Sequence, residues 1–95
     1  MGKIFPARVR FLSTAEGGRL EPAQDGIRPQ LDLGDVKTTC VVRSATGARI
    51  FDADQTYDVE LEIVFWDQYG HLFNPDDPIR LYDGSRLIAI GEFVR

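Results

Sequence analysis

The sequence predicts an all-β protein, closed into a six-stranded antiparallel Greek-key barrel. Apolar and polar residues alternate with a period of two in several segments, which is the pattern of half-buried strands. Gly, Pro, Asn and Asp separate these segments at short intervals. No segment keeps a helical period over ten or more residues. About six strands in 95 residues fit one domain spanning residues 1–95, and barrel closure removes the strand edges that so small a sheet would otherwise expose.

Six strands are expected, and the first three differ in how their apolar and polar residues are arranged. They lie near residues 4–13, 28–33, 37–43, 57–66, 78–82 and 86–94. In the first strand, inward residues such as Val9 alternate with Arg8 and Arg10, which predicts a basic outer face. The second is a shorter segment of the same kind around Leu31. The third is rich in β-branched residues, which favour strands.

The fourth strand has the clearest alternation, because Val59, Leu61 and Ile63 are separated by acidic residues. The fifth is short and leads into Asp83-Gly84, a strong signal for a tight hairpin turn. The sixth is apolar on both faces, so we expect it to be covered on both sides or to lie at a contact. The inward positions predicted from these patterns are Val9, Phe11, Leu31, Val59, Leu61, Ile63, Ile79, Leu81 and Ile90.

Charge and composition narrow the class of protein. The formal net charge is -4, from 11 basic and 15 acidic residues, so the chain lacks the overall basic character of a generic nucleic-acid binder, although a local basic face is compatible with it. The single cysteine cannot form an internal disulfide. Residues 1–6 lack the apolar core of a signal peptide, and no apolar run approaches the length of a membrane span. These features predict a cytoplasmic protein that does not bind membranes.

Four short motifs follow one another in an order found in a known family. They are Phe-Leu-Ser-Thr-Ala-Glu-Gly-Gly-Arg at 11–19 with Pro22, Gly-Ile-Arg-Pro-Gln at 26–30, Thr46-Gly47 with Ile50, and Asp-Gly-Ser-Arg-Leu-Ile-Ala-Ile-Gly at 83–91. Together they extend over nearly the whole chain. They resemble motifs of the C-terminal β-barrel domain, the third domain, of bacterial elongation factor Tu. The combination of Glu-Gly-Gly-Arg with Arg-Pro-Gln carries most of this resemblance.

The resemblance implies a six-stranded antiparallel barrel that stands alone. The chain has no phosphate-binding Gly-x-x-x-x-Gly-Lys-Ser/Thr loop, and nothing in it matches the GTPase domain of the factor. In the factor, this barrel packs against the middle barrel, helps to hold the T-stem side of aminoacyl-tRNA and contacts the exchange factor. The resemblance therefore implies a binding role connected with translation.

The chain departs from the family pattern where tRNA binding would matter most. Leu20 and Glu21 replace the family's His-Thr, which lies near the tRNA backbone. A carboxylate repels a phosphate, and a leucine side chain donates no hydrogen bond. Residues 53–55 and 66–73 also differ from the family. These differences, with the net negative charge, disfavour tRNA as the partner.

Arg19 matches the family's tRNA-facing arginine. Its guanidinium can form a bidentate contact with a phosphate or a carboxylate of a partner. Alternatively, it bonds carbonyl groups of its own corner, or pairs with Glu16 or Glu21.

Arg28 and Gln30 flank Pro29 at the start of a predicted strand. They can line a partner groove, or Pro29 fixes the backbone while Arg28 pairs with an acidic neighbour. The same two alternatives apply to Arg8 and Arg10, which form either a basic stripe or cross-strand ion pairs with the acidic strand.

The segment after the fourth strand is the richest in aromatic residues. Trp66, Tyr69, His71 and Phe73 lie within eight residues of one another. Aromatic side chains of this kind are favoured at interfaces, because they combine a large apolar area with a polar tip. The alternative is that the loop folds its rings over one end of the barrel. Trp66 is better placed to cover the barrel end, and Tyr69 is better placed to contact a partner. We therefore expect Tyr69 and His71 to be at least partly exposed.

Catalysis and metal binding lack a supporting pattern. Cys40 and His71 can be written as a nucleophile and base, but Cys40 lies in the middle of a strand, where a buried thiol is usual. No spacing of His71 with aspartates fits a metal site. The sequence thus predicts a non-catalytic module without cofactor, metal or small-molecule substrate. The leading hypothesis is that the module binds a translation-related protein. The alternative is that it binds RNA, including tRNA, at a local basic face.

Overall fold

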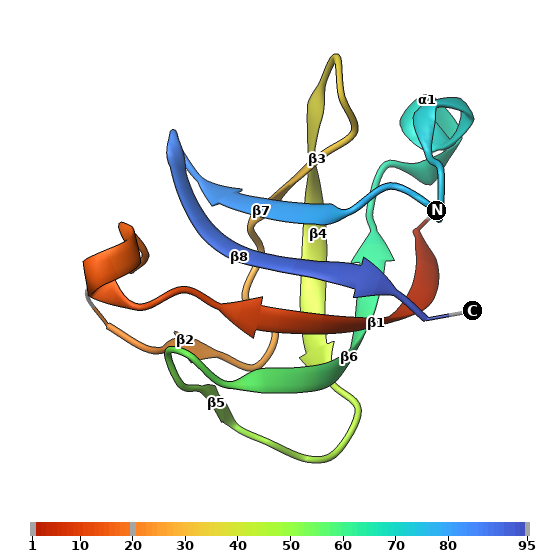
Figure 1. Ribbon diagram of the computed structural model, residues 1–95. Helices are drawn as coiled ribbons and strands as arrows, with labels where there is room; N and C mark the ends of the chain where they lie inside the picture. The colour runs from red at the N-terminus through yellow and green to blue at the C-terminus, as the bar shows by residue number, and fades with distance from the viewer. Residues whose placement is uncertain (1, 20, 95) are drawn as a thin grey trace.

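The barrel predicted from the sequence is confirmed. The computed structural model describes residues 2–19 and 21–94, so Leu20 lies outside the described residues. Six antiparallel strands close in the order β1-β6-β4-β3-β7-β8 (Figure 1). Their bounds are β1 Lys3–Phe11, β3 Gln30–Asp32, β4 Lys37–Ser44, β6 Thr56–Ile63, β7 Ile79–Asp83 and β8 Arg86–Phe93. Two further short strands, β2 Ala23–Gln24 and β5 Ile50–Phe51, pair with each other and were not predicted.

The strand order is that of a Greek key. The strands β3, β4 and β6 follow one another along the barrel wall, and β1 lies on the far side of β6. The long connection from β1 to β3 therefore crosses one end of the barrel. Its β2 strand pairs there with β5, which belongs to the connection between β4 and β6. This small sheet places Phe51 against Phe11, with the rings stacked at a centroid separation of 4.9 Å, and so closes that end of the core.

Eight of the nine predicted inward residues are buried, and Ile90 is the exception. Ile90 is only half-buried and lies on the outer side of β8. A register shift in the pairing of β7 with β8 explains the difference, because Leu81 pairs with Ala89 whereas Tyr82 pairs with Leu87. The extra residue, Ile88, faces the core together with Ala89, so the alternation changes phase at this bulge.

The helical segments are single turns. They are η1 at Thr14–Glu16, α1 at Trp66–Tyr69 and η2 at Gly70–Leu72. The first and fourth strands are shorter than the predicted 4–13 and 57–66, because Ser13 caps η1 and the chain turns after Ile63 into α1. Within residues 2–19 and 21–94, no helix is long and apolar enough to cross a membrane.

Candidate binding surface at the barrel corner

The corner after β1 is held by a capping box. The Ser13 hydroxyl accepts from the Glu16 backbone N–H at 3.3 Å, and the Glu16 carboxylate accepts from the Ser13 backbone N–H at 3.2 Å. The same carboxylate accepts from Arg10 Nη1 at 3.0 Å and from Nη2 at 3.2 Å. The hydrogen bond with Arg10, followed by that with the Ser13 backbone, lowers the pKa of Glu16 to about 2. The corner is therefore fixed to the strand that precedes it.

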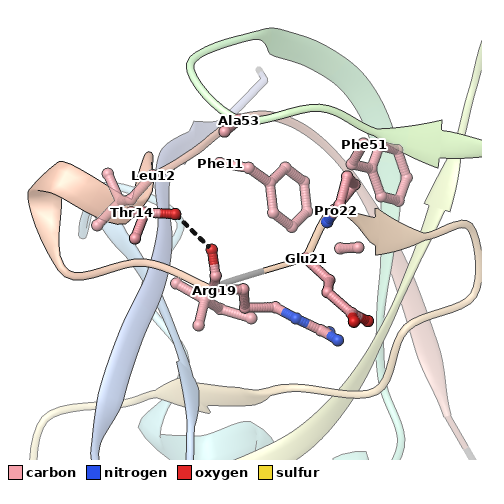
Figure 2. Close-up of a pocket in the computed structure, with 10 residues that line it drawn as sticks. Phe11, Leu12, Thr14, Arg19, Glu21, Pro22, Phe51 and Ala53 are labelled. Carbon is pink, nitrogen blue, oxygen red and sulfur yellow. Dashed lines mark hydrogen bonds between the residues drawn. The ribbon is translucent and has the colours of Figure 1, made fainter.

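Three further contacts direct the chain out of this corner toward Arg19. Gly18 packs so closely against the Leu12 carbonyl that a Cβ atom would collide with it, so the position requires glycine. The Arg86 guanidinium of β8 donates to the Gly18 carbonyl at 3.4 Å, and the Thr14 hydroxyl donates to the Arg19 carbonyl at 3.3 Å (Figure 2). The backbone of Arg19 is thus positioned by η1, and that of the preceding Gly18 by β8.

The segment that carries Arg28 and Gln30 is fixed by hydrogen bonds to β4. The backbone N–H groups of Val42 and Cys40 donate to the carbonyls of Ile27 and Pro29, at 2.9 and 3.0 Å. Pro29 is buried, whereas Arg28 and Gln30 on either side of it are exposed. Pro29 is thus held at the start of the strand, with both neighbouring side chains available at the surface.

The fold brings Arg19, Arg28 and Gln30 to one cleft. This corner cleft has a volume of about 240 Å³ and also contacts Tyr82 and Asp83 of β7. The three residues come from two segments separated along the chain, and both segments are tied to the barrel wall by the hydrogen bonds described above. Three of the seven residues proposed from the sequence therefore share one surface.

The arginines differ sharply in whether they have a partner. Arg8 Nε pairs with Asp58 Oδ1 at 3.0 Å, and Arg43 Nη1 pairs with Glu62 Oε1 at 2.9 Å. These contacts confirm the cross-strand pairing expected for Arg8. Arg10 pairs instead with Glu16 and Asp54, rather than with the acidic strand itself.

The side chains of Arg19 and Arg28 form no ion pair or hydrogen bond with any residue within 2–19 and 21–94. The alternatives in which Arg19 pairs with Glu16 or Glu21, and Arg28 with an acidic neighbour, are therefore wrong. Figure 2 shows the Arg19 and Glu21 side chains extending to the same side, beside a hollow of about 160 Å³ lined by the Phe11 and Phe51 rings. Arg19 lines both this hollow and the corner cleft.

The aromatic segment serves two purposes. Trp66 and Phe73 pack against Phe5 and Phe93 at the barrel end opposite the small sheet, with ring centroids of Phe5 and Phe73 4.4 Å apart and those of Trp66 and Phe73 5.5 Å apart. The Lys3 ammonium lies 4.8 Å from the centre of the Trp66 ring. Trp66 and Phe73 therefore cover this end of the core, as the alternative interpretation of the segment had it.

Tyr69 and His71 form no ring contact with the four members of that aromatic cluster. His71 is exposed and Tyr69 is half-buried, which confirms the exposure expected for both. The Tyr69 hydroxyl accepts from Gln68 Nε2 at 3.0 Å. Tyr69 lines a hollow of about 320 Å³ together with Gln30, Lys37 and Phe65, and Gln30 also belongs to the corner cleft.

Sequence reasoning did not select Phe65 or Lys37 for this surface. Phe65 is half exposed, although it continues the alternation of Val59, Leu61 and Ile63, which are buried. Lys37 lies with its ammonium 4.0 Å from the centre of the Tyr82 ring. Phe65 is exposed because the chain turns into α1 after β6. No local sequence pattern predicted that turn.

The thiol of Cys40 is fully buried in β4. Burial raises its pKa to about 12, so the nucleophilic thiolate is not formed near neutral pH. Among the described residues, no three His, Cys, Asp or Glu side chains come together in a group that could hold a metal ion.

Neither a protein-family model nor a curated protein matches this chain.

Proposed function

We propose that this chain is a non-catalytic binding module that uses the corner cleft to recognise a carboxylate-bearing segment of a protein partner. The observation that carries the proposal is the presence of Arg19 and Arg28 in one cleft with Gln30, since neither guanidinium has a partner among the described residues. An arginine fork matches the geometry of a carboxylate, and a charged group without an internal partner is available to an external one.

The rigidity of the surroundings supports this role. Arg19 follows a corner fixed by η1 and Arg86, and Arg28 follows backbone hydrogen bonds to β4. A site held on a rigid scaffold loses little conformational entropy when it binds. The adjoining hollow offers Phe65 and Tyr69, an apolar and an amphipathic ring, within reach of a segment that extends past Gln30.

A protein partner is favoured over RNA by the charges that border the cleft. Asp83 lines the cleft itself, and Glu21 and Asp25 line the next hollow beyond Arg19. These carboxylates repel an extended phosphate backbone but tolerate a single carboxylate placed between two arginines. The resemblance to the third domain of elongation factor Tu makes a translation-related, cytoplasmic protein the first partner to test.

Peptide selection provides a direct test. A displayed library of random peptides is selected on the folded protein, and the affinity of the enriched peptides is measured by fluorescence polarisation. We expect enriched peptides to share an acidic residue, and Arg19→Ala and Arg28→Ala each to weaken binding about tenfold or more. Arg49→Ala is the matched control, because Arg49 is exposed, has no ion pair with a described residue and lies outside the cleft.

Two results would contradict the proposal. One is enrichment of peptides without acidic residues. The other is an equal loss of affinity in Arg49→Ala and the cleft variants, which would indicate a general charge effect. Strong binding of tRNA that depends on Arg19 and Arg28 would instead support the RNA alternative.

A further inference from the structure

The outer side of β8 presents an apolar side chain between charged ones. We define the β8 outer face as Arg10 of β1, Arg80 of β7, and Ile90 and Glu92 of β8. These four residues, with Arg8 and Pro78, line a groove of about 470 Å³. In Figure 1, strands β7, β8 and β1 lie side by side toward the viewer, with no other described segment drawn across them. The half-buried Ile90 is at the centre, because Arg10 and Arg80 are its cross-strand neighbours.

Only two charges on this face lack a partner among the described residues. Arg8 pairs with Asp58, and Arg10 pairs with Glu16 and Asp54. Arg80 and Glu92, by contrast, form no ion pair or hydrogen bond with residues 2–19 or 21–94. Within the described part of the chain, the face thus offers one cation and one anion without a partner, both beside the same isoleucine.

The positions of these two charges are related by symmetry. Arg80 lies directly across from Ile90 on the neighbouring strand, about 5 Å away, and Glu92 lies two residues along β8, about 7 Å away. A two-fold axis that runs in the plane of the face through Ile90, diagonal to β8, exchanges these two positions. It sets Ile90 against Ile90 of a second copy, and each Arg80 against the opposing Glu92.

We infer that the β8 outer face is an isologous interface with a second copy of this chain. A two-fold axis makes one patch its own partner, so a self-complementary face needs no second kind of protein. Because the axis is diagonal to β8, the β8 strands of the two copies cross each other at about 90°, which is the orthogonal class of sheet packing. This interface uses neither the corner cleft nor the aromatic segment, so it is independent of the proposed function.

Charge exchange tests this arrangement. Sedimentation equilibrium over a range of concentrations is expected to show a monomer–dimer equilibrium of the unmodified chain. Arg80→Glu and Glu92→Arg alone each place like charges opposite one another and should weaken dimerisation about tenfold or more. The double variant restores opposite charges and should regain most of the affinity.

Ile90→Glu removes the apolar centre and should abolish the dimer. Its matched control is Ile50→Glu, because Ile50 is 51% exposed and lies on β5, outside the face. Circular dichroism melts establish that each variant is folded. A chain that stays monomeric at its highest soluble concentration overturns the inference. So does a double variant that dimerises no better than the single ones, or a dimer lost equally in Ile50→Glu and Ile90→Glu.

Discussion

Arg10 and Glu16 join the end of the first barrel strand to the turn that follows it, through two hydrogen bonds of 3.0 and 3.2 Å. Because the Glu16 carboxylate also accepts from the Ser13 backbone, one acidic side chain connects the strand, the cap of η1 and the start of the segment that carries Arg19. Protonation of Glu16 would remove the negative charge that strengthens its hydrogen bonds with Arg10 and with the Ser13 backbone.

Removing this carboxylate should change the pH dependence of stability. The pKa of Glu16 is about 2 in the folded protein and 4.5 ordinarily, so its stabilising effect is complete above pH 4.5 and is lost as the pH falls toward 2. Glu16→Gln should therefore melt at a lower temperature than the unmodified chain at pH 7, and the difference should shrink between pH 4.5 and 2. Glu60→Gln is the control, because Glu60 is exposed and forms no ion pair with another described residue. A difference that does not vary with pH would exclude this role for the charge.

Leu61→Ala should be strongly destabilising. Leu61 is fully buried on β6, between β1 and β4, so its truncation leaves a cavity in the core. The free energy of unfolding should fall by about 2–5 kcal/mol in urea denaturation. Glu60→Ala, on the outer side of the same strand, should change it by less than about 0.5 kcal/mol. A loss below about 1 kcal/mol for Leu61→Ala would mean that the strand is not packed as described.

Gly91→Ala should also destabilise the barrel, but by overpacking. Gly91 faces inward between Val9 and Ile79, and a Cβ atom there would collide with the Arg8 carbonyl of β1. We expect a loss of about 1–3 kcal/mol in the same urea experiment, because β1 and β8 must move apart. Ser85→Ala, in the exposed turn before β8, should have little effect. Equal stability of Gly91→Ala and the unmodified chain would contradict the close approach of the two strands.

Mutations should distinguish the role of Trp66 in stability from the role of Tyr69 in binding. Trp66→Ala opens the cluster with Phe5 and Phe73, so the free energy of unfolding should fall by about 3 kcal/mol. Tyr69→Ala should cost less than about 1 kcal/mol and leave the melting temperature nearly unchanged, while weakening peptide binding by more than about 1 kcal/mol. If Tyr69→Ala unfolds the protein, the segment acts only as a cover for the barrel.

Binding of tRNA should be weak at about 150 mM salt. The net charge is -4, and Glu21 and Asp83 line the same hollows as Arg19 and Arg28. Any residual binding through phosphates should fall steeply as salt rises, with a slope that counts the contacts. A fluorescence titration with labelled tRNA at several salt concentrations measures this. Tight binding that resists salt would contradict the proposal for a protein partner.

The barrel itself was predictable because one simple period governs most of it. The alternation in β1 and β6 identifies the residues that face the core, and Asp83-Gly84 marks the hairpin between β7 and β8. Ile90 was placed wrongly because a bulge changes the phase of β8, and a bulge depends on pairing with the neighbouring strand rather than on local sequence. The small sheet was missed for a different reason, since two residues are too few to show a period.

The candidate site was predictable only in part. The sequence identified Arg19, Arg28 and Gln30 by resemblance, but their shared cleft depends on how the segment after η1 meets the segment beside β4. Whether each arginine is paired also depends on tertiary contacts. Arg10 and Arg19 look equally available in the sequence, yet only Arg10 has acidic partners among the described residues.

Closure of the barrel has a consequence for how the chain folds. Strand β1 pairs with β6 and with β8, and the Val94 backbone N–H donates to the Pro6 carbonyl at 3.0 Å. Both partners of β1 therefore lie roughly half the chain or more away from it in sequence. Contacts of such high sequence separation are formed late and make folding slow. During synthesis, β1 must wait with both of its edges unpaired until β6 has left the ribosome, and it gains its second neighbour only with β8. An early intermediate with these edges free is the species most exposed to aggregation.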